Sequence, residues 1–200
     1  MLVKFSRPLF LALAAAVLPG VAQAHTGTGH LMGMLHGFQH PISGLDHILA
    51  MVLVGVFAAQ IGGRAVWLVP VSFLAALALG GALGVAGVQM PFLEVGIAMS
   101  VVILGAIVAL VVKAPLPAAM GLVGLFAIFH GYAHGAEMPL GADAAAYAAG
   151  FMVTTAVLHT LGIGIGLSIG RMNARHGALV ARSAGSLASI AGIGLLIAAV

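Results

Sequence analysis

Residues 65–88 read AVWLVPVSFLAALALGGALGVAGV, a run of 24 residues without a charged side chain. A helix needs about 20 mostly apolar residues to cross the hydrocarbon core of a bilayer, so this run alone predicts a membrane span. The whole chain is similar, with 62% hydrophobic and 6% charged residues, which excludes a soluble domain. The net charge of +3 is therefore no sign of nucleic-acid binding. The absence of cysteine excludes disulfides and thiolate metal sites.

The N-terminal segment has the composition of a cleavable signal peptide. Lys4 and Arg7 form a basic start, residues 8–18 a short apolar core, and residues 22–24 (Ala-Gln-Ala) a cleavage site. Because the apolar core is shorter than a span requires, we expect cleavage rather than an uncleaved first helix. Residues 1–24 are predicted to be a signal peptide, and residues 25–200 a single transmembrane domain that begins at His25.

The mature chain divides into six apolar stretches that predict an all-α, polytopic membrane helical bundle of six transmembrane helices. These stretches are Ile42–Ile61, Ala65–Val88, Phe92–Val112, Leu116–His134, Ala145–Ser168 and Ser183–Val200. Glycines recur at four-residue spacing, which predicts close approach of helix backbones in lipid. They are Gly80/Gly84, Gly131/Gly135 and Gly162/Gly166/Gly170.

The charges predict the orientation of this bundle. If cleavage leaves the mature N-terminus in the periplasm, every connection with positive charge falls on the cytoplasmic side, as the positive-inside rule requires. These positive residues are Arg64, Lys113, Arg171, Arg175 and Arg182, whereas the carboxylates Asp46, Glu94, Glu137 and Asp143 fall on the periplasmic side. We therefore expect a multi-pass protein of a bacterial inner membrane with both mature termini in the periplasm.

Seven of the nine histidines are predicted to lie on the outer side of the membrane. They are His25, His30, His36, His40, His47, His130 and His134. His159 is predicted to lie in mid-membrane and His176 in the basic inner connection. Ionisable residues within a membrane are costly and usually mark an ion path, although a lone histidine could instead be a hydrogen-bonded contact between helices.

The first cluster is residues 40–47, HPISGLDH, in which His40 and His47 are predicted to lie two turns apart on one helix face. Asp46 either binds a cation or orients a neighbouring imidazole. Because proline is tolerated in a first helical turn, the helix is expected to start at Pro41, which leaves His40 open to a place in the preceding loop. Two imidazoles and a carboxylate suit borderline divalent ions.

The second cluster is residues 129–137, FHGYAHGAE. The i, i+4, i+7 spacing predicts that His130, His134 and Glu137 share one helix face, where two or three of them could bind one ion. Both clusters at the same membrane depth predict a shared metal site.

Together these two stretches resemble the signature motifs of the HupE/UreJ family of nickel permeases, which is associated with hydrogenase and urease maturation. The resemblance extends over essentially the whole chain. It implies a nickel or cobalt permease in which His40, Asp46, His47, His130, His134 and Glu137 carry transport, with the ion as the substrate and no cofactor.

The same residues suggest an order of events and leave two alternatives. We expect a histidine-bearing N-terminal segment, with His25 and His36, to capture the ion, and His159 to lie on the route inward. No nucleotide-binding loop is present, so this chain is not expected to be an ATPase. A membrane-embedded zinc hydrolase using Ser43 or Ser100 is the main alternative, and a bis-histidine haem protein is the third.

Overall fold

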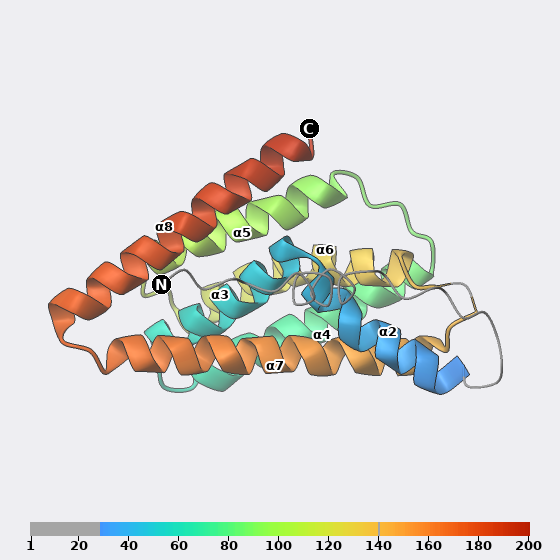
Figure 1. Ribbon diagram of the computed structural model, residues 1–200, viewed down its shortest axis with the longest axis horizontal. Coiled ribbons are helices and arrows are strands. Elements are labelled where there is room, and N and C mark those ends of the chain that lie inside the picture. Colours follow the sequence, from blue (N-terminus) through green and yellow to red (C-terminus); the bar gives the residue numbers. More distant parts are fainter. Residues whose placement is uncertain (1–28, 140) are drawn as a thin grey trace, which may run out of the picture.

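The computed structural model describes residues 29–139 and 141–200, in which the chain forms α-helices and connections (Figure 1). The helices are α2 (Gly29–Ser43), α3 (Leu45–Ile61), α4 (Ala65–Val85), α5 (Leu93–Ala109), α6 (Leu116–Ala136), α7 (Ala144–Gly170) and α8 (Ala174–Ala198). The predicted signal peptide, its cleavage site and His25 lie outside the described residues.

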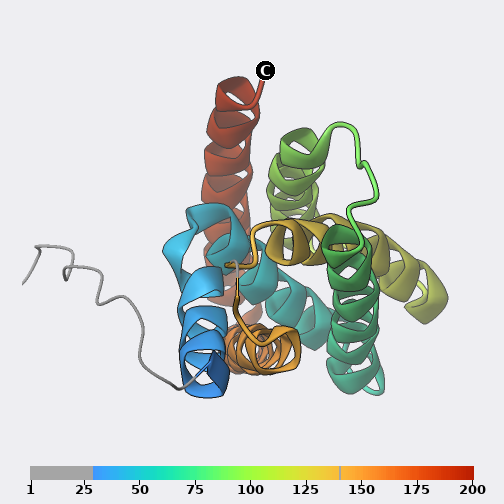
Figure 2. The ribbon, with the colours of Figure 1, turned by 90° about the vertical axis from the view of Figure 1, so that its right-hand side faces the viewer.

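The helices pack mainly in pairs. Helix α4 lies along α6, α5 lies along α8, and both α2 and α3 pack against α7. Helix α3 also contacts α4 and α5, which places it at the centre of the bundle. Figure 2 shows the α5–α8 pair standing as its own layer beside the other helices. The core is apolar, and Met51, Phe57, Phe73, Leu77 and Leu104 in it are fully buried.

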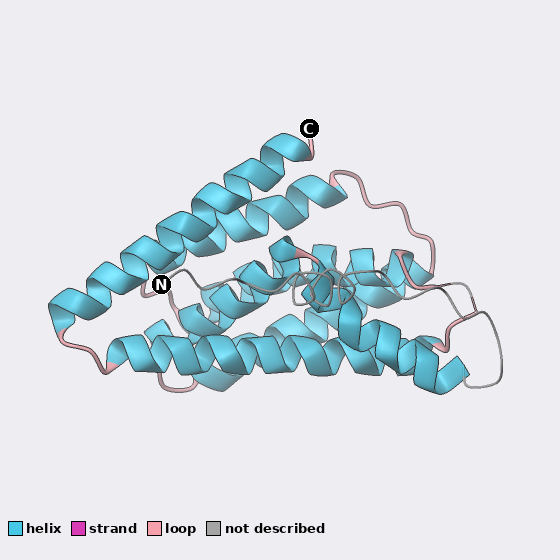
Figure 3. Ribbon diagram, in the orientation of Figure 1, coloured by secondary structure: helices cyan, strands magenta, loops and turns pink. Residues whose placement is uncertain are grey.

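Figure 3 shows helices and no strand in the described part of the chain, as predicted for an all-α fold. Each of the six predicted apolar stretches overlaps one helix from α3 to α8 over most of its length. Four of these, α4, α6, α7 and α8, are long and apolar enough to cross a membrane by themselves. Helix α5 is apolar but has only 17 residues. Six spans therefore remain a prediction.

The region around the first histidine cluster differs from the prediction. No helix starts at Pro41. Helix α2 contains both His40 and Pro41, and the helical conformation is interrupted at Gly44. Gly44 has an extended backbone, and residues 32–43 meet α3 at a bend of 82°. Glycine favours such a break because it is a poor helix former. An added Cβ at Gly44 would lie 2.5 Å from a carboxylate oxygen of Asp46. This segment is therefore a bent helix pair rather than one continuous helix.

The last helix also begins earlier than predicted. Helix α8 starts at Ala174, so Arg175, His176 and Arg182 lie on a helix rather than in a connection. Asn173 caps this helix, because its side-chain oxygen accepts the backbone N–H of His176 at 3.0 Å. This capping asparagine explains why the helix extends into a stretch that is rich in charge.

Glycines hold α4 and α6 together, as their spacing predicted. A Cβ at Gly80 or Gly84 on α4 would overlap backbone atoms of α6, and one at Gly131 or Gly135 would overlap backbone atoms of α4. Gly162 approaches Val52 of α3 in the same way. At Gly170 the structure leaves open space, so the prediction of close packing is wrong there.

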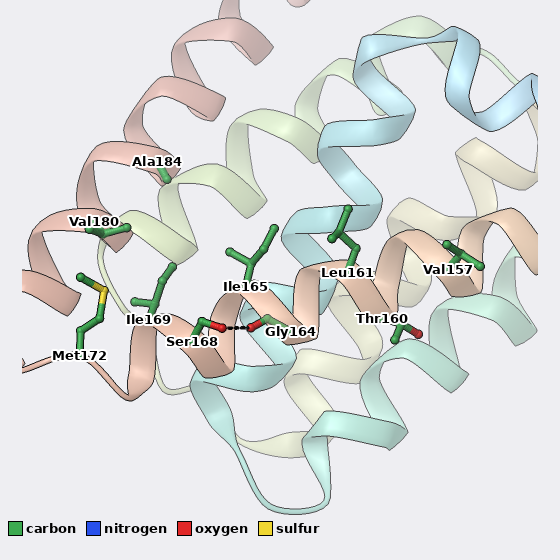
Figure 4. Close-up of a pocket in the computed structure, with 10 residues that line it drawn as sticks. All are labelled: Val157, Thr160, Leu161, Gly164, Ile165, Ser168, Ile169, Met172, Val180 and Ala184. Atoms are coloured by element: carbon green, nitrogen blue, oxygen red, sulfur yellow. Dashed lines mark hydrogen bonds between the residues drawn. The ribbon is translucent and has the colours of Figure 1, made fainter.

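A groove of about 1010 Å³ lies between α7 and α8 (Figure 4). Its lining is almost entirely apolar, and its two hydroxyl groups are already bonded within α7. Thr160 donates to the carbonyl of Ala156 at 2.8 Å, and Ser168 donates to that of Gly164 at 2.7 Å. The described residues that line this groove include no histidine or carboxylate, so the groove is not the metal site that the two motifs predict.

Candidate metal site

Three helix ends bring the two histidine clusters together. His40 lies near the end of α2, His47 lies in the first turn of α3, and His130 and His134 lie in the last two turns of α6. The packing of α4 on α6 and of α2 and α3 on α7 fixes these ends relative to one another. The prediction that the clusters meet is therefore confirmed.

The imidazole rings of the four histidines lie close to one another. His47 has its ring centroid 4.9 Å from that of His130 and 4.8 Å from that of His134, and His40 lies 4.8 Å from His134. Two imidazoles that bind one ion through nitrogens at about 2.0–2.1 Å have ring centroids roughly 5 Å apart. The spacing of the rings thus suits ligation of a shared ion.

The rings are not yet turned toward one point. Among the described residues, no group of three or more histidine and carboxylate side chains is arranged to hold a metal ion. The neighbouring rings are T-shaped, with interplanar angles of 64–76°. Binding one ion through these rings would therefore require them to rotate.

Two hydrogen bonds fix which nitrogen of each ring is available. The Nδ1 of His47 lies 2.9 Å from Asp46 Oδ1, and the Nδ1 of His130 lies 3.0 Å from the carbonyl oxygen of Phe126. Since both oxygens only accept, each Nδ1 carries the proton and each Nε2 of the neutral ring is left as a ligand. In this arrangement Asp46 orients His47, one of the two roles that the sequence left open.

Four imidazole nitrogens of this cluster are buried and without a hydrogen-bond partner in the part of the chain that the structure describes. They are His47 Nε2, His130 Nε2 and both nitrogens of His134. His130 and His134 have fully buried side chains. Buried polar atoms are normally paired, because an unpaired one loses its hydration without compensation. Four such atoms at one place indicate a site that binds something.

His40 contacts a carboxylate at the exposed edge of the cluster. Its Nε2 lies 3.0 Å from Glu137 Oε2, and both side chains are partly exposed. Two sequence interpretations are corrected here. His40 and His47 do not share one helix face, because the bend at Gly44 puts them on different helices with rings 6.4 Å apart. Glu137 follows the end of α6 as its C-cap and contacts His40 rather than extending the face of His130 and His134.

Aromatic residues of α7 form the wall of the cluster, which the sequence did not reveal. Phe151 stacks on His134 with centroids 4.9 Å apart and an interplanar angle of 11°. Tyr147 lies 6.1 Å from His40 and 5.7 Å from Phe151. Their four-residue spacing was the only available signal, and it is also typical of any buried helix face.

The remaining candidate histidines lie apart from the cluster. His36 lies on an exposed face of α2. His159 is buried in the middle of α7, with its ring 4.9 Å from that of Phe73. Figure 1 shows α7 running from the end near α2 to the opposite end, where α8 begins. His176 is exposed in the first turn of α8. Of these histidines, His159 and His176 were predicted to lie away from the histidine cluster, and the structure agrees, whereas His36 was predicted to lie on the same side as the cluster.

A small pocket adjoins the cluster on the side of α5 and α8. Its volume is about 210 Å³, and it is lined by Asp46, by Glu94 and by apolar residues of α5 and α8. Glu94 is exposed in the first turn of α5. The same carboxylate that orients His47 therefore also faces a recess that has a second negative charge.

Comparison with known proteins identifies the family. Residues 13–195 match the HupE / UreJ protein family. The chain is 47% identical over 195 residues to Protein HupE of Rhizobium leguminosarum bv. viciae, which covers 97% of this chain and 99% of that protein. No solved structure is significantly similar to the chain. The match over most of the chain and the arrangement of both motifs at one site lead to the same conclusion: the chain belongs to the HupE/UreJ family.

Proposed function

We propose that this protein is a secondary permease that imports a divalent transition-metal ion, nickel or cobalt, across a bacterial inner membrane. Its transport site would consist of His40, Asp46, His47, His130, His134 and Glu137. The observation that carries the proposal is a group of four buried imidazole nitrogens at one end of a helical bundle, none of which has a hydrogen-bond partner among the described residues. Membership of the HupE/UreJ family supports it.

These ligands explain why the ion would be a divalent transition metal, but they do not explain a preference for nickel or cobalt over copper or zinc. Neutral imidazoles suit nickel, cobalt, copper and zinc, and copper binds most tightly to such ligands. A nickel or cobalt carrier therefore depends on geometry and on the metals that the periplasm supplies. The rotation that the rings need for binding also fits transport, because a site must release its ion as well as bind it.

The distribution of charge supports inward movement through six transmembrane helices. The connections α3–α4, α5–α6 and α7–α8 have positive charges, whereas the carboxylates lie at the other ends of the helices. The positive-inside rule then places the histidine cluster at the periplasmic face. A dication that moves inward gains about twice the ~2.3 kcal/mol per charge per 100 mV of membrane potential.

The alternative of a zinc hydrolase is not supported. A serine nucleophile needs its hydroxyl to face a general base. Ser43 instead donates to the carbonyl of His40 at 2.7 Å, and Ser100 donates to that of Ile97 at 2.6 Å. Neither serine hydroxyl is bonded to an imidazole of the cluster.

Metal accumulation by cells that express the protein tests the proposal. Cells are supplied with trace nickel or trace cobalt, and the metal content per cell is compared with that of cells without the protein. A gain for nickel or for cobalt is expected. No gain for either metal, with the protein present in the membrane, would contradict the proposed function.

The Glu94→Gln change should lower uptake at trace metal by roughly tenfold, because a carboxylate at a recess raises the local concentration of cations. The effect should disappear when metal is abundant. Glu94→Asp, which keeps the charge, is the matched control and should retain most of the uptake. Equal uptake by the glutamine variant and the unaltered protein at trace metal would show that the recess has no role in ion entry.

The His25→Ala change should impair uptake at trace metal and spare it at abundant metal. Cleavage after Ala24 would put a free amino group and an imidazole on the same residue, and together they can chelate one divalent ion. His36, exposed on α2, would assist this capture segment. Cleavage is confirmed by mass, and uptake is measured over a range of metal concentrations. Unchanged uptake at trace metal would refute the capture role while leaving the membrane site intact.

A further inference from the structure

A second group of buried polar atoms lies deeper in the bundle, on α7. Both ring nitrogens of His159 and the hydroxyl of Thr155 are buried and have no hydrogen-bond partner among the described residues. His159 is 1% exposed and Thr155 is fully buried. Residues at i and i+4 lie on the same face of a helix, so the hydroxyl and the imidazole are neighbours.

Among the threonines of this helix, Thr155 differs from the other two, whose hydroxyls are bonded to backbone carbonyls. Thr154 donates to the carbonyl of Phe38 on α2 at 3.0 Å, and Thr160 donates to the carbonyl of Ala156 at 2.8 Å. Both groups are therefore satisfied. Valine has nearly the same shape as threonine but lacks the hydroxyl, which at Thr155 makes no hydrogen bond to any described residue. Stability alone does not account for a threonine there.

Phe73 of α4 connects this deeper group to the outer cluster. Its ring lies edge-on to that of His159, with centroids 4.9 Å apart and an interplanar angle of 88°. The same ring lies 6.1 Å from that of His130. One fully buried aromatic ring thus lies against an imidazole of the outer cluster and against the deeper imidazole.

We propose that Thr155 and His159 form a second, inner binding site for the transported divalent ion, which the ion reaches from the outer cluster by passing the ring of Phe73. The imidazole of His159 binds the ion directly, and the hydroxyl of Thr155 binds the ion or one of its waters. The ring face of Phe73 attracts the passing cation. This inference rests on the proposed function and adds a site to it.

Two binding sites in series determine different steps of transport. The outer cluster determines how tightly the ion is captured, and the inner site determines how fast a captured ion moves on, as in conduction through several weak sites. Changes at the inner site should therefore lower the maximal rate of uptake. They should leave the half-saturating metal concentration within about twofold of the original value, because the outer ligands are untouched.

Uptake into proteoliposomes that contain the purified full-length protein tests this. Thr155→Val should lower the maximal rate roughly threefold to tenfold, and His159→Leu should lower it at least about tenfold. Thr160→Val is the matched control and should transport normally, because Thr160 is exposed at the groove of Figure 4 and its hydroxyl is bonded to the carbonyl of Ala156. Thr155→Val should also keep or raise the melting temperature, because it removes an unsatisfied buried group. A purely structural role for the hydroxyl predicts the opposite change in stability.

Several results would overturn the inner site. Equal maximal rates of uptake for the Thr155→Val and Thr160→Val proteins would refute it. A His159→Leu protein with an unchanged maximal rate and a changed half-saturating metal concentration would also refute it. If His159→Leu does not fold, His159→Asn and Thr155→Val decide the question. If the unaltered protein takes up no metal, the proposed function fails, and the inner site is judged by bound nickel per chain at saturation. His159→Leu should then bind one ion fewer, and an equal count would refute the site.

Discussion

Replacing His134 with alanine should abolish metal uptake. His134 is the ring that contacts both His40 and His47, with centroids 4.8 Å away in each case, and neither of its nitrogens has a partner in the described structure. It is therefore the most central candidate ligand. Loss of one ligand at fixed geometry cannot be compensated by a neighbour, because binding constellations tolerate only about 0.5 Å of displacement.

His47→Ala should have the same effect, since Asp46 holds that ring with its Nε2 available. The matched control is His176→Ala. His176 is exposed in the first turn of α8 and its ring lies 2.8 Å from the side-chain oxygen of Asn173, so uptake should be unchanged. Uptake of nickel and of cobalt is measured at equal protein level in the membrane. Similar losses for all three variants would defeat the assignment of the site.

The sequence predicted the proximity of the two motifs better than it predicted the local helix boundaries. Both motifs place imidazoles at ends of apolar stretches, and the alternation of spans puts those ends on the same side of the bundle, so a shared cluster was expected. The contact of His47 with His130 and His134 depends on how the helices pack. The bend at Gly44 could not be predicted in the same way. Glycine permits a break but does not require one, and several other glycines of this chain lie inside straight helices.

Side-chain contacts between segments that are distant in the sequence could not be predicted either. The stacking of Phe151 on His134 and the contact of Phe73 with His159 depend on how α4, α6 and α7 are rotated against one another. Each of these helices has apolar residues on all of its faces, so the spacing of apolar residues does not reveal which face is buried. The one available signal for Thr155 was its position four residues before His159.

Replacing Gly131 with alanine should destabilise the protein and strongly reduce uptake. Gly131 lies between His130 and His134 in sequence, and a Cβ there would overlap the carbonyl oxygen of Leu77 on α4. It would also lie 2.9 Å from the backbone nitrogen of Gly81. Backbone atoms inside a helix cannot move aside individually, so the whole of α4 would have to separate from α6. Overpacking of this kind typically costs about 1–3 kcal/mol.

The loss of uptake should exceed what reduced protein level explains. Moving α6 away from α4 displaces the two histidines that flank Gly131, and a misplacement of about 1 Å can cost a site most of its activity. The measurement is uptake per folded protein, together with the melting temperature in detergent.

Gly121→Ala is the control on the same helix. An added Cβ at Gly121 meets nothing within 4 Å, and the residue is exposed, so alanine should be neutral or stabilise the helix by up to about 1 kcal/mol. Full uptake by the Gly131→Ala protein, with a melting temperature equal to that of the Gly121→Ala protein, would mean that α4 and α6 do not pack closely at the metal site. In that case the glycines of the second motif would need an explanation other than helix approach.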